Sequence, residues 1–344
     1  PITQRKPLYM KRILHLINDA TPTRGGAQKI LELLRADELA QGKESYSFSK
    51  YRQDNLKNKN NFIGGANWII KLILTALQLK PEHIIIHSRF YLPFAPIFRL
   101  AGLKTIFYAH ANYKSGLYTF KIFKSTSYLA LSAAVRDNLI FAGIPNNKIH
   151  LIKNPIIATS TVYPNYPSAS VNVSFVGGLH PWKGITNLLD YISTIETRLH
   201  LIIIGDGPLK KEILLKIANL PHNVSVDMLG EVENPFTKLK NCNINIMPSI
   251  EEGFGLVAIE SMYHGRILIH SDTPALEEVC RNDGLSFSFS HTTPSSFKAA
   301  LDLAIKKSQT EITSDTLANR SERILLEYGI TNFYNSYRTI LNKN

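Results

Sequence analysis

The segment 249–262, SIEEGFGLVAIESM, constrains the fold of this chain more than any other stretch. Residues 243–248 before it alternate apolar and polar side chains as a short strand does, and residues 256–264 predict a helix. A strand, a glycine turn and a helix present unpaired backbone N–H groups and a partial positive charge at the helix amino end. Glu252 and Glu260 flank that anion site, so a phosphate with hydroxyl-bearing groups on both sides, as in a nucleotide-sugar, would fit.

The string PSIEEGFGLVAIESM resembles the E-x7-E motif of retaining glycosyltransferases of family 4, which have the GT-B fold. Two glutamates eight positions apart are common, and a surface turn with a capping glutamate is the alternative interpretation. The resemblance implies that Glu260 binds the ribose hydroxyls of the donor and that Glu252 binds the hydroxyls of the donor sugar. It also implies backbone contacts to the donor from five residues: Gly253, Phe254, Gly255, Leu256 and Val257.

The length of 344 residues is typical of two domains. Strand-like and helix-like runs alternate on both sides of a proline-rich stretch at 155–170, which predicts a linker there. Alternating strands and helices form parallel sheets covered on both faces. We therefore expect an α/β protein of the GT-B class, with two Rossmann-like domains facing across a cleft. They are an acceptor-side domain at 1–160 (1–9 as a leader) and a donor domain at 161–327, with a helix at 328–344 packing back on the first domain.

A second motif, FVGGLHPWKG at 175–184, ends a predicted strand and opens a helix. It resembles the strand–Gly-Arg-Leu–loop–Lys-Gly element of the family, whose arginine and lysine bind the donor diphosphate. Lys183 occupies the lysine position, where an ammonium group suits a phosphate. Gly178 occupies the arginine position, so a charged contact of about 1.5–3 kcal/mol is absent. Arg24 and His180 are our candidates for a compensating cation.

Three further elements resemble the family in order and position. The loop GGAQ begins with Gly25 and Gly26 and resembles a Gly-Gly-Ala-Glu loop that faces the donor phosphates. His110 follows a predicted strand, where a histidine of the family contacts the donor sugar; a loop histidine without a role is the alternative. The turn GDGP at 205–208 either frames the base pocket or serves the fold alone.

Together these matches imply a retaining glycosyltransferase of the hexosyltransferase type. It would transfer a sugar from a UDP- or GDP-sugar to a glycan or lipid-linked glycan, in bacterial-type envelope polysaccharide synthesis such as that of lipopolysaccharide. The predicted catalytic residues are Glu252, His110 and Lys183. A nucleotide-sugar epimerase of the same fold, or a catalytically weak nucleotide-sugar-binding partner subunit, are the alternatives.

The sequence does not predict a metal site or a bound cofactor. It has no Asp-x-Asp triplet, and its two cysteines, Cys242 and Cys280, are too far apart for a metal-binding pair. Two isolated cysteines favour a reducing, cytoplasmic location. No run of about 18 apolar residues is present, so we expect no transmembrane helix.

Charge is distributed unevenly along the chain. Residues 1–170 hold 23 Lys and Arg against 8 Asp and Glu, whereas residues 171–344 hold 16 against 19. A basic first half favours an anionic partner, although a basic surface without a partner is the simpler alternative. No nucleic-acid recognition motif is present, so we expect an anionic membrane surface, contacted from the cytoplasmic side. The segment 113–124 interleaves aromatic residues and lysines and is the membrane or acceptor-loop candidate, while the apolar stripe at 68–79 is expected to pack in the core.

Overall fold

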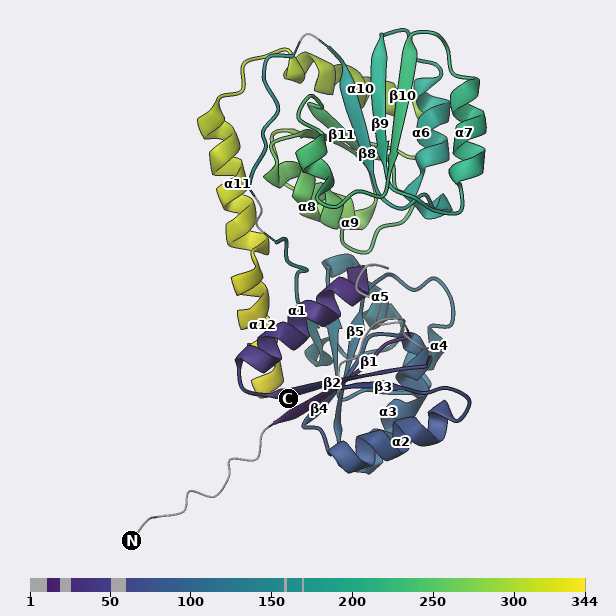
Figure 1. The fold of residues 1–344 in the computed structure, drawn as a ribbon, viewed down its shortest axis with the longest axis vertical. Coiled ribbons are helices and arrows are strands. Elements are labelled where there is room, and N and C mark those ends of the chain that lie inside the picture. The colour runs from purple at the N-terminus through teal and green to yellow at the C-terminus, as the bar shows by residue number, and fades with distance from the viewer. Residues whose placement is uncertain (1–10, 19–25, 51–59, 158–159, 169, 344) are drawn as a thin grey trace. The chain divides into compact units, whose positions relative to one another are not determined.

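The computed structural model describes residues 11–18, 26–50, 60–157, 160–168 and 170–343. The chain divides into two compact units, drawn in Figure 1. Unit 1 contains residues 1–154 together with 333–344, and unit 2 contains residues 155–332. The units divide between Asn154 and Pro155, and the sequence analysis predicted a boundary at residue 160.

Unit 1 is built on a seven-stranded sheet with the order β3-β2-β1-β4-β5-β6-β7. All six neighbouring pairs run parallel. The strands are β1 Arg12–Leu16, β2 Glu44–Ser49, β3 Asn61–Ile63, β4 His83–Ile86, β5 Lys104–Ala109, β6 Ser127–Ala130 and β7 Ile149–Leu151. The central strands are rich in isoleucine and buried along most of their length, because helices cover both faces of the sheet.

Several helical segments in the described ranges connect these strands. They are α1 Gly26–Ala40, α2 Trp68–Leu79, the 3-10 helix η2 Arg89–Phe94, α3 Ala95–Leu100, α4 Tyr118–Ile122, α5 Ala133–Phe141 and the 3-10 helix η3 Asn146–Lys148. The C-terminal helix α12, Ile330–Lys343, lies beside α1 (Figure 1). Phe333 and Tyr337 of α12 share a buried cluster with Ile13 and Leu34, and the Arg338 guanidinium pairs with Asp37. Residues 333–343 of this helix are therefore part of unit 1, whereas the predicted range 328–344 also includes residues 328–332 of unit 2.

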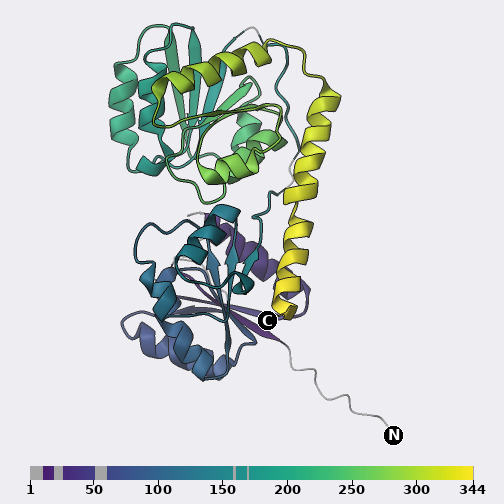
Figure 2. The same ribbon diagram turned by 180° about the vertical axis from the view of Figure 1, so that it is seen from behind.

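Unit 2 contains a six-stranded parallel sheet with the order β10-β9-β8-β11-β12-β13. The strands are β8 Asn172–Val176, β9 Leu199–Ile204, β10 Val224–Gly230, β11 Ile244–Met247, β12 Ile267–Ser271 and β13 Ser286–Phe289. The helices are η4 Pro181–Lys183, α6 Ile185–Ile192, α7 Lys210–Ala218, η5 Pro235–Lys238, α8 Leu256–Tyr263, α9 Pro274–Val279, α10 Pro294–Ser308 and α11 Ser314–Tyr328. Helix α10 lies across one face of this sheet, as Figure 2 shows.

The strand orders locate the point in each unit where a ligand is expected. In unit 2 the chain first builds β8, β9 and β10 outward in one direction and then returns to add β11 on the other side of β8. In unit 1 the same reversal separates β1 from β4. Ligands of open parallel sheets bind at the carboxyl ends of the strands beside such a reversal. The loops after β8 and β11, and those after β1 and β4, are therefore the places to look for a site.

Helix α2 corrects one expectation from the sequence. It buries only Leu72 and Ala76. Ile70, on the apolar stripe that we assigned to the core, is 61% exposed, and Leu74 is 50% exposed. A 12-residue helix over the sheet needs only one face to cover it, so the remaining apolar side chains point to solvent. Within the described residues, no helix has the length and apolar character needed to cross a membrane.

Candidate functional site

The loops after β8 and β11 are fastened to each other by their backbones. Ile250 donates its N–H to the Trp182 carbonyl at 2.8 Å, and Glu251 donates to the same carbonyl at 3.2 Å. Gly184 ends the β8 loop with φ +69°, and a Cβ there would lie 1.9 Å from the Pro248 carbonyl oxygen. Only glycine fits this approach, so the two loops act as one rigid platform.

Lys183 and Glu252 form an ion pair on this platform. The Lys183 Nζ lies 2.6 Å from the Glu252 Oε2, and Ser249 Oγ donates to the same oxygen at 3.4 Å. The side chains are 24% and 13% exposed. Two residues that are 69 positions apart in the sequence are therefore brought together at the strand reversal of unit 2. The pair offers a cation for a phosphate and a carboxylate for hydroxyl groups within one site.

The amino end of α8 follows Glu252 after a turn of three residues. Gly255, with φ +89°, precedes the first helical residue Leu256, and no side chain caps the helix there. The backbone N–H groups in the first turn of a helix have no partner within the helix, so the N–H groups of Leu256 and Val257 suit an anion. Glu260 lies one turn further along α8 and is half-buried, while Ala258 and Ile259 pack inward.

The predicted donor-contact residues Gly253 and Phe254 occupy the turn between Glu252 and α8. The Phe254 side chain is only 6% exposed and makes an edge contact with Tyr328, at 5.9 Å between ring centroids. It therefore anchors the turn in the core of unit 2 and leaves only its backbone available to a ligand.

Gly178 stands where the family has an arginine, and a histidine ring lies beside it. The His180 ring lies near Gly178, where an added Cβ would be 2.9 Å from the His180 Cδ2. The same ring stacks on Trp182, with centroids 4.4 Å apart and planes 7° apart. The indole is 46% exposed and offers an aromatic face beside Lys183, which we did not predict. Arg24, the other candidate cation, lies outside the described residues.

The glycine turn after β9 serves the packing of the backbone. A Cβ on Gly205 would lie 1.9 Å from the Gly177 carbonyl oxygen. Gly177 and Leu179 also donate their N–H groups to the carbonyls of Ile204 and Asp206. A Cβ on Gly207 would lie 2.7 Å from the Leu179 carbonyl oxygen. Backbone packing thus explains both glycines of the turn without a ligand, which favours the structural interpretation over a base pocket.

In unit 1, His110 directly follows β5 and belongs to a chain of histidines. Its Nε2 lies 2.9 Å from the Nδ1 of His87, and its ring stacks on Tyr108 with centroids 4.2 Å apart. Burial lowers the pKa of His110 to about 3, so the imidazole is neutral. Of the predicted glycines, Gly26 begins α1 with open space around its Cα, and Gly25 lies outside the described residues. The sequence analysis did not single out His87, because it lies 23 positions before His110 and no sequence motif contains both.

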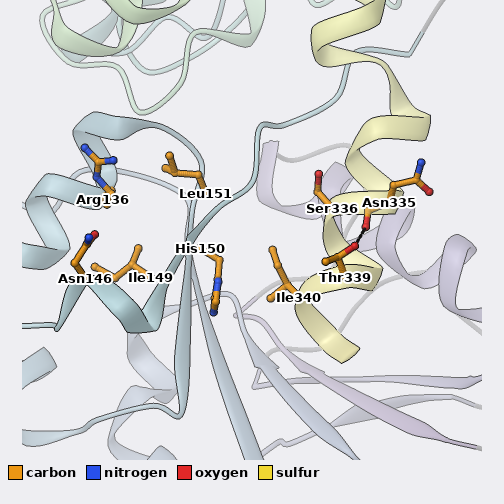
Figure 3. A pocket seen from close by; sticks show the side chains of 9 residues that line it. All are labelled: Arg136, Asn146, Ile149, His150, Leu151, Asn335, Ser336, Thr339 and Ile340. Atoms are coloured by element: carbon orange, nitrogen blue, oxygen red, sulfur yellow. Dashed lines mark hydrogen bonds between the residues drawn. The ribbon is translucent and has the colours of Figure 1, made fainter. Parts of the chain in front are cut away.

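Among the described residues, no metal-ligand cluster, cysteine or surface hollow adds to this site. No group of three or more His, Cys, Asp or Glu in the described ranges could hold a metal ion. Burial raises the pKa of the Cys242 and Cys280 thiols to about 12, which leaves both protonated. A surface hollow of about 580 Å³ in unit 1 lies between β7, α5 and α12, with Arg136 and His150 in its lining (Figure 3). None of the predicted site residues lines it.

Comparison with solved structures identifies the fold. The model superposes on the crystal structure of Anabaena Alr3699/HepE in complex with UDP and glucose with a TM-score of 0.79, covering 97% of this chain and 100% of that one at 16% identity. The protein has the GT-B fold. Residues 167–322, most of unit 2, match the family model for glycosyl transferases group 1.

Curated relatives match parts of the chain. An N-acetylgalactosaminyltransferase of Campylobacter jejuni, named for an acceptor linked to diphospho-undecaprenol, is 36% identical over 87 residues, which are 25% of this chain and 24% of the relative. The O-antigen biosynthesis glycosyltransferase WclY of Escherichia coli is 26% identical over 217 residues, or 62% of this chain and 59% of the relative. The GT-B chain thus spans less than two thirds of the length of these relatives.

Proposed function

We propose that the protein is a retaining glycosyltransferase of family 4, which transfers a sugar from a nucleotide-sugar to a hydroxyl of a glycan or lipid-linked glycan. The observation that carries this proposal is the Lys183–Glu252 pair at the strand reversal of unit 2. The match of residues 167–322 to the glycosyl transferase model supports it.

Each of the site residues binds a different part of the nucleotide-sugar donor. Lys183 and the first N–H groups of α8 bind the diphosphate, because a cation and a helix amino end both favour phosphate. Glu260 accepts hydrogen bonds from the ribose hydroxyls. Glu252 exchanges its contact with Lys183 for the hydroxyls of the donor sugar, with the backbone at Gly253 and Gly255 alongside.

The same groups favour the transition state of sugar transfer. As the bond between the sugar and the diphosphate breaks, negative charge grows on the leaving phosphate, where Lys183 and the α8 amino end are already oriented. In a retaining transfer the acceptor hydroxyl attacks from the face that the diphosphate leaves, and the phosphate takes its proton. The protein contributes positioning and electrostatic stabilisation.

For the donor we propose a UDP- or GDP-sugar, and for the acceptor an envelope glycan built on a lipid carrier at the cytoplasmic face of the membrane. Support comes from the similar structure that holds UDP and glucose and from the two relatives named for O-antigen and undecaprenol-linked acceptors. The base, the sugar and the linkage are questions for direct measurement.

Thermal unfolding with a panel of UDP-, GDP- and ADP-sugars tests the donor site. A donor at about 100 times its dissociation constant adds roughly 2.7 kcal/mol of stability, so a matching donor raises the melting temperature by several degrees. Glu260→Ala should remove the shift, whereas Glu212→Ala on the exposed side of α7 should keep it. If no donor shifts the wild type, or if Glu260→Ala keeps the full shift, the proposed site is wrong.

The helices α2, α3 and α4 of unit 1 form the surface that we propose to contact the membrane. Their most exposed apolar residues are Ile70, Leu74, Leu100, Tyr118 and Ile122. Trp68 of α2 packs on Phe90 of η2, and Arg99 of α3 donates to the Lys124 carbonyl, so the segments are neighbours. Several exposed cations accompany them: Lys71, Lys80, Lys104, Lys114, Lys121 and Lys124. Apolar side chains among lysines suit the headgroup region of an anionic bilayer.

Vesicle flotation tests this surface. Vesicles with phosphatidylglycerol should bind the protein more than neutral vesicles, and salt should weaken the binding because it screens the lysines. The double substitution Ile70→Ser with Ile122→Ser should lower binding, whereas Leu326→Ser, on exposed α11 of unit 2, should not. Equal binding to anionic and neutral vesicles would refute the membrane surface.

A further inference from the structure

A continuous chain of hydrogen bonds runs through the interior of unit 1 and ends at His110. Its first member is Glu38 of α1, whose Oε2 lies 3.0 Å from the Nε2 of His15 on β1. The Nδ1 of His15 lies 3.0 Å from the Nε2 of His87, which follows β4. The Nδ1 of His87 lies 2.9 Å from the Nε2 of His110. Four side chains from four elements thus form one line of contacts.

The chain is shielded from water and held at its far end by α12. Glu38 is 1% exposed, His15 0% and His87 5%. The Tyr337 hydroxyl of α12 donates to the Glu38 Oε1 at 2.6 Å. Burial alone would raise the pKa of Glu38, but the charge that His15 carries when it is protonated, and the hydrogen bonds from His15 and Tyr337, lower that pKa below its ordinary value. Glu38 is therefore an ionised carboxylate at neutral pH.

An ionised carboxylate at one end decides the direction of every bond when the three histidines are neutral. A carboxylate only accepts, so His15 donates from Nε2 and keeps its lone pair on Nδ1. His87 then donates from Nε2 to that lone pair, and His110 donates from Nε2 to His87 Nδ1. The lone pair of His110 remains on its own Nδ1.

The far nitrogen of His110 is the open end of this chain. Its Nδ1 is buried and has no hydrogen-bond partner among the described residues. Such an atom carries a cost unless a donor reaches it, and a neutral imidazole nitrogen with a lone pair accepts an O–H group. Burial lowers the pKa of His87 and His110, which keeps both rings neutral.

We propose that Glu38, His15 and His87 are positioning residues that hold His110 with its proton on Nε2, so that its Nδ1 can accept a hydrogen bond from a sugar hydroxyl. The role of the sugar hydroxyl rests on the proposed function, whereas the tautomer is a property of the free protein. One added proton on His15 would reverse the two bonds between histidines and turn His110 Nδ1 into a donor, while His15 would still donate to Glu38. Among the described residues, other titratable groups that face the chain include Tyr108, at His87 and His110, and Tyr337 and Arg35, at Glu38.

Nitrogen-15 NMR of the histidine side chains at about pH 8 tests the tautomer without any substrate, because protonated and unprotonated ring nitrogens differ in chemical shift. His110→Gln identifies the His110 signals by their loss. We expect His110 protonated on Nε2 in the wild type and a mixture of tautomers in His87→Gln, where the chain is interrupted. The matched control is His83→Gln, a buried histidine on the same strand whose ring nitrogens have no partner. A wild-type His110 protonated on Nδ1 would overturn the proposal, as would a tautomer unchanged in a folded His87→Gln.

Binding measurements then separate this proposal from the proposed function. The probes are UDP-glucose and GDP-mannose, each compared with its free nucleoside diphosphate. His87→Gln should weaken the nucleotide-sugar by about 3- to 10-fold, the range of one hydrogen bond, and leave the diphosphate unchanged. Equal loss for both probes would refute the role of the chain in sugar binding. Absence of binding by the wild type to every probe would instead refute the proposed function, while the tautomer result would stand.

Discussion

The two units place very different chemistry on the same strand arrangement. In unit 2 the reversal between β8 and β11 carries a charged pair, Lys183 and Glu252, on loops locked by backbone contacts. In unit 1 the reversal between β1 and β4 lies beside a row of buried histidines that ends at a buried carboxylate. Charge at a half-exposed site attracts an anion, whereas neutral polar groups in a dry interior fix a direction of hydrogen bonding. The strand order thus determines where a site lies, and the side chains at that place determine what the site can bind.

The largest effect should come from disturbing the rigid platform of unit 2. Gly184→Val places side-chain atoms against the Pro248 carbonyl at a positive φ, so we expect a loss of more than about 3 kcal/mol in the free energy of unfolding. Denaturant titration measures it. Gly284→Ala, where nothing lies within 4 Å of the new Cβ, is the control and should stay within about 0.5 kcal/mol. If Gly184→Val unfolded at the same denaturant concentration as the wild type, the two loops would be able to move apart at little cost in free energy.

The charge of unit 2 is tested by Lys183→Ala. Loss of one charged phosphate contact should weaken binding of the preferred nucleoside diphosphate by roughly 10- to 150-fold, corresponding to about 1.5–3 kcal/mol. Calorimetric titration gives the affinity. Lys210→Ala is the matched control, because Lys210 also pairs with a carboxylate, Asp206, but on the exposed turn after β9. Equal losses in both variants would mean that only net charge matters.

Buried histidines of unit 1 should make the free energy of unfolding depend on pH. Burial lowers the pKa of His83 to about 4 from its ordinary 6.5. Between these values the unfolded chain binds a proton that the folded chain excludes, so stability falls as the pH falls, by roughly 1.4 kcal/mol per pH unit for one full proton. His83→Gln should make this slope shallower, as measured by denaturant titrations from pH 7 to pH 4. The exposed His222→Gln is the control, and an unchanged slope in His83→Gln would contradict the assignment.

The smallest effect is expected at Gly178. A methyl group there meets chiefly the His180 ring, the end of a side chain and not backbone, so Gly178→Ala should cost less than about 1 kcal/mol. Thermal unfolding measures it. A loss as large as that of Gly184→Val would show that the stacked His180 and Trp182 rings are a fixed part of the platform.

Local patterns were enough to predict the fold class and the strand, turn and helix that carry the proposed site residues. The strand–turn–helix patterns around Lys183 and Glu252 are short-range, and the structure has a strand, a turn and a helix at both places. The prediction of a core position for the α2 stripe was wrong, because apolar periodicity shows which face a helix could bury but not how much surface is available to cover it. The exposed Ile70 and Leu74 illustrate this limit.

The sequence by itself determined the α/β class, the two parallel sheets and the glycine turns, since each depends on the conformational preferences of neighbouring residues. Only the tertiary structure decided which side chains meet. Lys183 reaches Glu252 across 69 positions, and His15 reaches His87 across 72. Such pairs form because crossover connections bring the ends of distant strands to one edge of a sheet. The chemistry of this protein is therefore set by strand order, which converts residues far apart in the chain into partners about 3 Å apart.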